Sequence, residues 1–243
     1  MGTLSSPESQ FSETVREHVL SPIETANERA KREYEEVRTE QRAFNQFKER
    51  VSGINSVPPP QAHSMPPIPS VDTLGRESVQ PVRNAFRATV MNVDHYDDLY
   101  GESLNEHVAA ELSPEIATLF KTEKTTAFTE PAKTALIGAV NSAITQRDVL
   151  LDRLERELDS LENSHTALTE LLDAYAEPRV ADRYRLQVEE KLDTLAKARQ
   201  ETLKNRPSTA RGNGHDLCQY LYQDSEWTYP VLTALARFRR SLV

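Results

Sequence analysis

A heptad pattern of apolar residues between Ile137 and Tyr175 is the feature that most constrains the fold of this chain. Stepping alternately by three and four residues from Ile137 reaches twelve positions, of which ten are apolar. These seam positions are Ile137, Val140, Ile144, Leu151, Leu154, Leu158, Leu161, Leu168, Leu172 and Tyr175. A sustained 3.5-residue period is what a left-handed coiled coil requires. The segment is therefore predicted to be a long helix that buries this stripe against another helix. Arg147 and His165 are its polar seam positions, which are typical of residues that set register or partner choice.

A second amphipathic segment follows at residues 180–205, after the short break Ala176–Arg179. Its apolar residues on one side are Ala181, Tyr184, Val188, Leu192, Leu195 and Leu203. Short connections favour antiparallel neighbours, and the charges agree, because residues 137–175 carry a net −5 and residues 180–206 a net +2. The predicted fold is all-α, an elongated antiparallel coiled-coil hairpin with additional N-terminal and C-terminal helices.

The chain divides into five predicted segments. They are an N-terminal amphipathic helix region (1–52), a proline-rich linker (53–72), a short-helix region (73–135), the coiled-coil helical hairpin (136–206) and an aromatic C-terminal segment with a helix (207–243). Six of the fourteen prolines fall between Pro58 and Pro69, which favours an extended polyproline II spacer. Pro66–Pro69 is also a PxxP sequence, a pattern that can dock on aromatic grooves.

Proline also marks several predicted helix starts. The first segment is expected to be helical from about Pro7 to Val51. Within it, Ser21–Glu24 has a serine cap, a proline at the first helical position and a glutamate three residues after the cap, which is the pattern of a helix start. Ser113–Glu115 repeats this signal, and Tyr229-Pro230 is expected to start the last helix. From Ile23 an apolar series recurs every seven residues to Val51, interrupted by Glu33 and Glu40. Residues 94–102 (DHYDDLYGE) are expected to form a turn.

Composition narrows the class of protein. The net charge of −9 opposes a general affinity for nucleic acid or an anionic membrane. A single cysteine, Cys218, excludes an internal disulfide and a cysteine-based zinc cluster. Residues 1–10 carry no signal-peptide pattern, and no run of about 18 apolar residues predicts a membrane span. A cytoplasmic protein is the prediction.

Several stretches together resemble a known family. These are Glu40–Arg50, Val82–Met91, Leu104–Pro114, Asp216–Asp224 and Thr228–Leu232, of which the aromatic C-terminal stretches are the most specific. In this order they resemble an uncharacterised haloarchaeal family, a domain of unknown function with a central coiled coil. The resemblance covers most of the chain. It implies a helical cytoplasmic protein and carries no activity, cofactor or catalytic residue.

Three groups of residues contain side chains of the types that bind metal ions. His165 and Glu162 share one helix face in the Glu-x-x-His spacing of di-iron bundles, but such a site needs further copies that the sequence lacks. His95 with Asp97 and Asp98 fits a solvated turn as well as a cation site. His107 with Glu111 fits an ordinary polar helix face. No metal, cofactor or catalytic residue is predicted.

Cys218 lies three residues after His215, but no oxyanion site or orienting group is recognisable, so an inert thiol is the better interpretation. The C-terminal residues Tyr220, Tyr222, Trp227 and Tyr229 either form a protein-docking surface or cap the end of a helical bundle. Arg237, Arg239 and Arg240 could contact phosphate, or could complement the dipole of the last helix.

The predicted function is that of a non-catalytic structural or protein-interaction protein, which acts through its coiled coil on a protein partner or on a second copy. The alternative is a regulator that contacts nucleic acid through the C-terminal arginines. An enzyme, including a metal-dependent one, is not expected, and no small-molecule substrate is evident.

Overall fold

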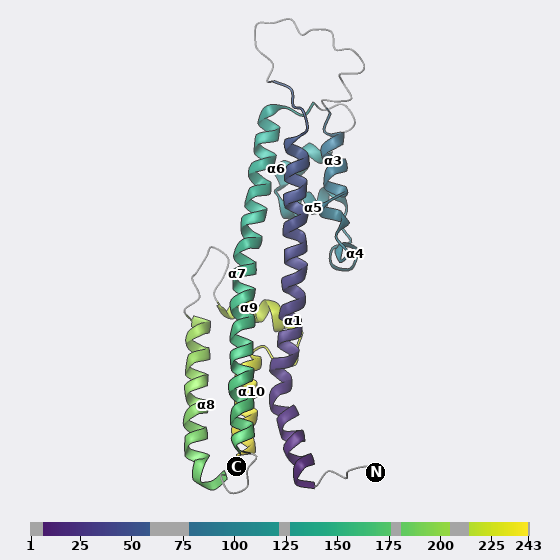
Figure 1. The fold of residues 1–243 in the computed structure, drawn as a ribbon. Coiled ribbons are helices and arrows are strands. Elements are labelled where there is room, and N and C mark those ends of the chain that lie inside the picture. Colours follow the sequence, from purple (N-terminus) through teal and green to yellow (C-terminus); the bar gives the residue numbers. More distant parts are fainter. Residues whose placement is uncertain (1–6, 59–77, 122–126, 176–180, 205–213, 243) are drawn as a thin grey trace, which may run out of the picture. The chain divides into compact units, whose positions relative to one another are not determined.

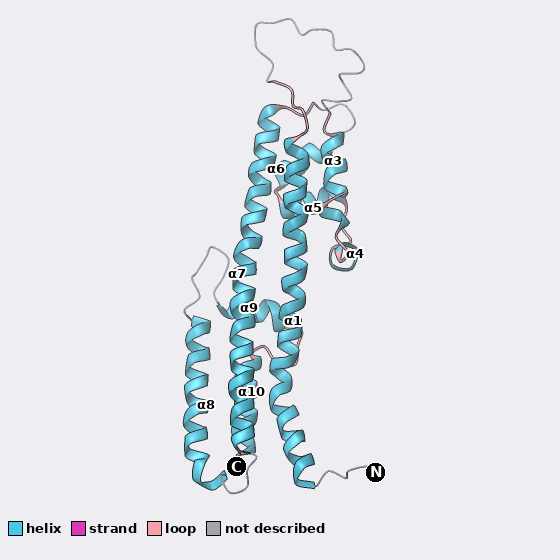
Figure 2. Cartoon of the chain, in the orientation of Figure 1, coloured by secondary structure: helices cyan, strands magenta, loops and turns pink. Residues whose placement is uncertain are grey.

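The computed structural model describes residues 7–58, 78–121, 127–175, 181–204 and 214–242, with the side chains of residues 7–12, 175, 181–184 and 214–216 left out. Within these residues the regular elements are helices, which confirms the all-α prediction (Figures 1 and 2). They are α1 (Pro7–Ser52), α3 (Gln80–Arg87), the 3-10 turn η1 (Val90–Asn92), α4 (Tyr96–Leu99), α5 (Leu104–Glu111), α6 (Pro114–Lys121), α7 (Glu130–Tyr175), α8 (Ala181–Lys204), α9 (Gly214–Tyr222) and α10 (Pro230–Ser241). No helix in these ranges is long and apolar enough to span a membrane.

The chain forms two compact units. Unit 1 comprises Met1–Tyr34 and Arg153–Val243, and unit 2 comprises Glu35–Asp152. The boundaries fall inside α1 and α7, so each unit combines parts of several predicted segments. Most of the proline-rich linker, with its Pro66–Pro69 sequence, lies outside the described residues.

Helix α1 runs without interruption from Pro7 to Ser52, with Pro22 inside it. The expected helical segment from about Pro7 to Val51 is confirmed, whereas the start signal at Ser21–Glu24 does not begin a helix. Val19 and Leu20, just before the proline, are 0% and 4% exposed, and their burial extends the helix past the local start signal. The seven-residue apolar series is confirmed, because its members Ile23, Ala30, Val37, Phe44 and Val51 are all at most 5% exposed.

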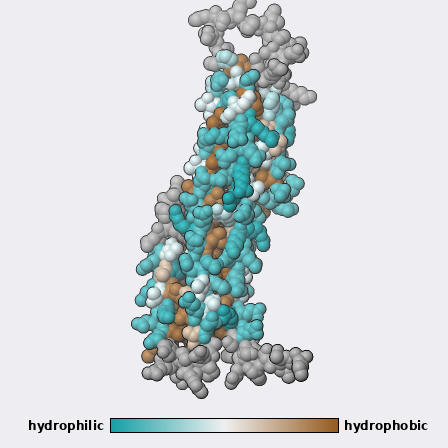
Figure 3. All heavy atoms as spheres, in the orientation of Figure 1, coloured by the Kyte–Doolittle hydropathy of each residue, from teal (hydrophilic) through white to brown (hydrophobic). Residues whose placement is uncertain are grey.

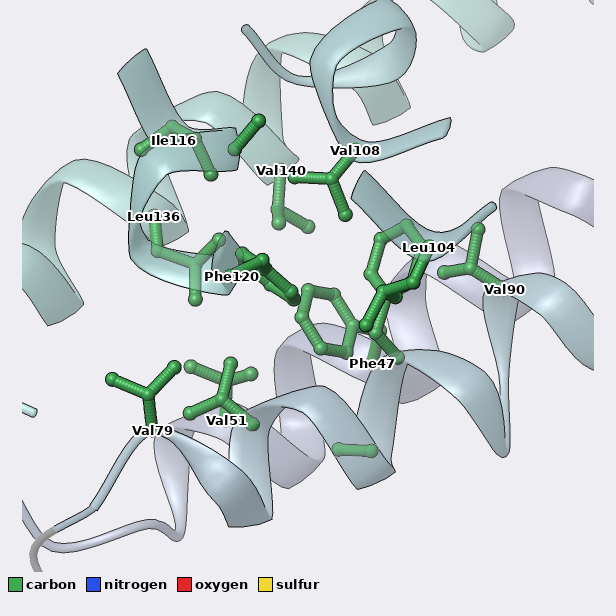
Figure 4. Packing of buried hydrophobic residues seen from close by; sticks show 14 of the residues in the cluster. Phe47, Val51, Val79, Val90, Leu104, Val108, Ile116, Phe120, Leu136 and Val140 are labelled. Carbon is green, nitrogen blue, oxygen red and sulfur yellow. The ribbon is translucent and has the colours of Figure 1, made fainter. Parts of the chain in front are cut away.

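Unit 2 is built around phenylalanine side chains from three helices. The ring of Phe86 on α3 packs edge-on against Phe47 of α1 at 5.0 Å and against Phe120 of α6 at 5.7 Å. Figure 4 shows Phe47 and Phe120 among aliphatic residues such as Val51, Val108 and Val140. Burial of this kind is the main stabilising term of a helical core.

The ends of the unit 2 helices are held by short polar contacts. The Ser113 hydroxyl accepts a hydrogen bond from the amide of Ile116, so the predicted start of α6 is confirmed. Lys133 donates to the carbonyls of Ser52 and Ile54 at 2.9 and 2.8 Å, where a cation complements the C-terminal end of α1. The predicted turn at residues 94–102 contains the short helix α4 and ends at Gly101, whose φ of +56° favours glycine.

Helices α1 and α7 run antiparallel within unit 1, since contacts between them descend on one helix as they rise on the other. Glu24 lies 3.3 Å from His165, and Asn27 is 3.5 Å from Glu162. Tyr34 donates to Glu155 at 2.7 Å. Helix α8 lies beside α7 (Figure 1). Arg199 of α8 donates to Glu157 and Ser160 of α7. Helix α7 therefore has α1 as a neighbour, which the sequence did not predict, and the coiled-coil hairpin with α8 stays a prediction.

Burial along α7 follows the predicted seam in part. Val140, Leu151, Leu154, Leu161, Leu168 and Leu172 are at most 9% exposed. Ile137, Ile144 and Leu158 are partly exposed, whereas Arg147 and Glu157 are buried, and the side chain of Tyr175 lies outside the description. A helix with neighbours on more than one side buries a wider stripe than a two-stranded seam. The visible outer face is mostly hydrophilic, with apolar residues in narrow stretches (Figure 3).

Candidate functional site

Buried charges gather in two clusters, one in each unit. The Arg147 cluster of unit 2 consists of Arg147, Glu40, Glu111, Tyr100 and His95. The Arg199 cluster of unit 1 consists of Arg199, Glu157, Ser160, Cys218 and Tyr222. Because charged groups are costly to bury unless they are paired, these clusters are where a function or a structural constraint is most visible.

The Arg147 cluster brings together two of the polar residues that interrupt the apolar patterns, Glu40 in α1 and Arg147 in α7. Arg147 of α7 donates from Nε to Glu40 of α1 at 3.0 Å and from Nη2 to Glu111 of α5 at 2.7 Å. Its guanidinium carbon lies 4.4 Å from the centre of the Phe44 ring, a cation–π contact. The side chains of Arg147 and Glu40 are 10% and 12% exposed. Arg147 therefore joins α1, α5 and α7 in unit 2.

Glu40 also holds the segment that contains α4. The Tyr100 hydroxyl donates to Glu40 Oε1 at 2.7 Å, and His95 Nε2 lies 3.3 Å from the same oxygen. Burial, reinforced by the hydrogen bond to Glu40, raises the pKa of Tyr100 far above its ordinary value. Burial alone would lower the pKa of Arg147, but the nearby carboxylates of Glu111 and Glu40 raise it overall. Arg147 is thus charged and Tyr100 neutral at physiological pH.

His107 is more enclosed than a polar helix face predicts. The residue is 2% exposed, and its Nδ1 lies 3.3 Å from Glu102 Oε2. Its ring packs at 4.9 Å against both Tyr96 and Tyr100. Glu111, which was paired with His107 in the sequence, contacts Arg147 instead.

The Arg199 cluster is the more deeply buried of the two. Arg199 of α8 and Glu157 of α7 form a two-pronged ion pair, with Nη2 at 2.7 Å from Oε1 and Nη1 at 3.0 Å from Oε2. Their side chains are 3% and 0% exposed. The Tyr222 hydroxyl of α9 donates to Glu157 at 3.2 Å. One carboxylate thus connects three helices of unit 1.

Arg199 has further contacts with α7 and α9. It donates to the Ser160 hydroxyl at 2.8 Å and lies 3.7 Å from the sulfur of Cys218. Burial alone would lower the pKa of Arg199, but the charge of Glu157 raises it by more, so the pKa is raised overall. The guanidinium therefore stays charged. Burial, then the Glu157 charge, raises the pKa of Tyr222 far above its ordinary value.

The Glu157–Arg199 pair was not predicted from the sequence, although the sequence contains a signal for it. Arg199 follows Leu192 by seven residues and precedes Leu203 by four, so it lies within the apolar stripe of α8. Glu157 lies next to the seam position Leu158, on the side of α7 that contacts α8. A charge within a stripe on each of two neighbouring helices indicates a buried pair, but only once the helices are known to be neighbours.

The predicted C-terminal interaction residues occupy different environments. Tyr222 is 1% exposed and part of the core, which corresponds to the bundle-capping alternative. Tyr220 is 52% exposed and its hydroxyl contacts Glu33, while Trp227 and Tyr229 are partly buried. The four aromatic residues therefore do not form one exposed surface.

The C-terminal arginines also differ from one another. Arg237 donates to the His18 carbonyl of α1 at 2.7 Å, and its guanidinium carbon lies 4.5 Å over the Trp227 ring. Arg239 pairs with Asp193 of α8. Arg240 is exposed. Two of the three arginines predicted to contact phosphate are thus occupied within unit 1.

The metal-site candidates are not brought together. His165 faces Glu24 and Glu162 faces Asn27, both on α1. His95 contacts Glu40, whereas Asp97 and Asp98 are exposed. In the part of the chain that the structure describes, no three His, Cys, Asp or Glu side chains are grouped as a metal would need.

Comparison with models of protein families matches residues 21–243 to one described as Domain of unknown function (DUF7260). This confirms the resemblance to an uncharacterised family, while the haloarchaeal source stays a prediction. No curated protein and no solved structure matches the chain.

Proposed function

Because the chain belongs to this family of unknown function, we propose its role from its own contacts: it is a non-catalytic structural or protein-interaction protein of the cytoplasm, which acts through paired long helices. In this proposal α7 forms a coiled coil with its helical neighbours, and the assembly binds a protein partner or a second copy.

The observation that carries the proposal is how the buried charges are used. Arg147, Glu157 and Arg199 each form an ion pair that joins different helices. Catalytic groups need a reactive atom directed at a substrate, with a base or acid poised beside it. Here the charges are used to join helices, which supports a scaffold.

Self-association can be tested by sedimentation equilibrium on the full chain over a range of concentrations. The proposal expects a mass above the monomer, or a partner that stays bound to the tagged full chain through washing and is then shown to bind as a purified protein. A chain that is monomeric at every concentration and retains no partner would contradict it.

Nucleic-acid binding is the alternative outcome. It predicts that affinity for a labelled DNA duplex falls steeply with salt, because phosphate contacts release counterions. Arg240→Ala should then weaken binding, whereas Arg156→Ala, an exposed arginine of α7, serves as the matched control. Contacts of Arg237 and Arg239 within unit 1 argue against this alternative.

A further inference from the structure

Pro22 creates a local defect in the hydrogen bonding of α1. Proline has no backbone N–H, so the carbonyl four residues earlier, that of His18, loses its intrahelical donor. The proline ring also crowds that carbonyl, which is why prolines inside helices are sites of kinking. Residues 13–21 of α1, here called the N-terminal arm, are joined to the rest of the helix through this weak point.

Arg237 of α10 supplies the missing donor. Its Nη1 donates to the His18 carbonyl at 2.7 Å and lies 3.4 Å from the Ser21 hydroxyl. Arg237 and Pro22 are far apart in sequence, yet the guanidinium donates to the carbonyl of His18, which lacks a backbone donor because residue 22 is a proline. A charged donor makes a stronger hydrogen bond than a neutral amide.

Two neighbours hold the guanidinium in place. Its carbon lies 4.5 Å over the Trp227 ring, and its Nη2 is 4.0 Å from Glu226. The Arg237 side chain is 16% exposed, whereas that of Glu226 is 74% exposed. α10 itself is anchored by buried Val231, Leu235 and Phe238. The donor is therefore delivered by a docked helix and has little freedom to turn away.

The arm also packs through residues on both sides of the His18 carbonyl. Val19 and Leu20 are buried next to the proline, and Arg16 pairs with Asp173 of α7. We propose that Pro22 is a hinge in α1 and that Arg237 is the latch that closes it. Docking of the C-terminal helix then controls whether the N-terminal arm stays packed on α7.

Hydrogen exchange of the arm amides in the full chain tests the latch. Arg237→Ala is expected to speed exchange in residues 13–21 about tenfold, the effect of losing one charged hydrogen bond. Arg237→Lys keeps a cation but loses the planar donor, and should fall between the two. Arg239→Ala is the matched control, because this arginine of α10 pairs with α8 instead of α1. It should leave the arm unchanged.

The double variant Pro22→Ala/Arg237→Ala tests the hinge. Alanine restores an N–H that can bond to the His18 carbonyl, so protection of the arm should return toward the wild-type level. Unchanged arm exchange in Arg237→Ala would overturn the latch. Equal loss of protection in the single and double variants would overturn the hinge. An equal rise in exchange throughout α10 in Arg237→Ala would overturn the latch, because Arg237 would then only hold its own helix in place.

Discussion

Replacing one member of the Glu157–Arg199 pair should destabilise unit 1 far more than replacing both. At the 2.7 Å contact distance and an effective dielectric constant of ~20, the attraction is about 6 kcal/mol. Removing both side chains from water costs several kcal/mol each, so the intact pair contributes little net stability. Glu157→Leu leaves Arg199 buried and uncompensated, and we expect a loss of about 3–5 kcal/mol in the free energy of unfolding.

The double variant Glu157→Leu/Arg199→Met removes both charges and fills the space with apolar groups. We expect its free energy of unfolding to lie close to that of the wild type, or above it by up to about 4 kcal/mol. The Tyr222 hydroxyl then loses its acceptor, so Tyr222→Phe should be added to the double variant as a control.

Urea unfolding followed by tryptophan fluorescence suits this experiment. Trp227 is the single tryptophan of the chain and belongs to unit 1, so its signal reports the unit that carries the pair. The reasoning is refuted if Glu157→Leu costs less than about 1 kcal/mol, the range of exposed ion pairs. It is also refuted if the double variant loses as much free energy of unfolding as Glu157→Leu and Arg199→Met lose together as single variants.

Three other predictions follow from the same contacts. The raised pKa of Tyr222 means that, above about pH 10, the folded chain keeps a proton that the unfolded chain releases. The free energy of unfolding of unit 1 should therefore be constant below about pH 10 and fall above it. Tyr222→Phe should make that fall smaller in urea unfolding curves measured at increasing pH. Arg147→Met leaves Glu40 and Glu111 without their shared cation, and we expect it to lower the stability of unit 2 by about 2–4 kcal/mol, measured by hydrogen exchange. Arg147→Lys should recover only part of this stability, because lysine lacks the planar guanidinium. A methionine variant as stable as the wild type would contradict a stabilising role of the cluster. The seam pattern alone predicts that His165→Leu raises the melting temperature, but the His165 side chain is 32% exposed and lies beside Glu24. We therefore expect the substitution to change the free energy of unfolding by less than about 1 kcal/mol, and a larger change in a thermal melt would contradict this.

Apolar periodicity predicted much of the helical structure because the spacing of apolar residues along one helix can be recognised from the sequence alone. The series from Ile23 to Val51 and most leucines of α7 are buried as the spacing indicated. Local start signals were less reliable. Ser113–Glu115 begins α6, but the same signal at Ser21–Glu24 lies inside α1, because the apolar residues before Pro22 find a place to pack.

The polar clusters could be predicted only in part. Glu40 and Arg147 were both visible as breaks in apolar patterns, yet they lie 107 residues apart, and one sequence does not reveal that they are partners. The Arg199 cluster needs three helices from unit 1 to be placed first. The sequence shows that Arg237 is charged, but its hydrogen bond to the His18 carbonyl depends on the helix geometry around Pro22.

The division of α1 and α7 between the units has a consequence for synthesis on the ribosome. Unit 2 is complete once residue 152 has emerged, whereas unit 1 must wait for the C-terminal helix. At ~5–20 residues per second, the remaining chain takes on the order of 5–20 s to make. Throughout that interval the first 34 residues have no finished partner surface, so a nascent chain would present the apolar side of Val19 and Ile23 to chaperones or to other nascent chains.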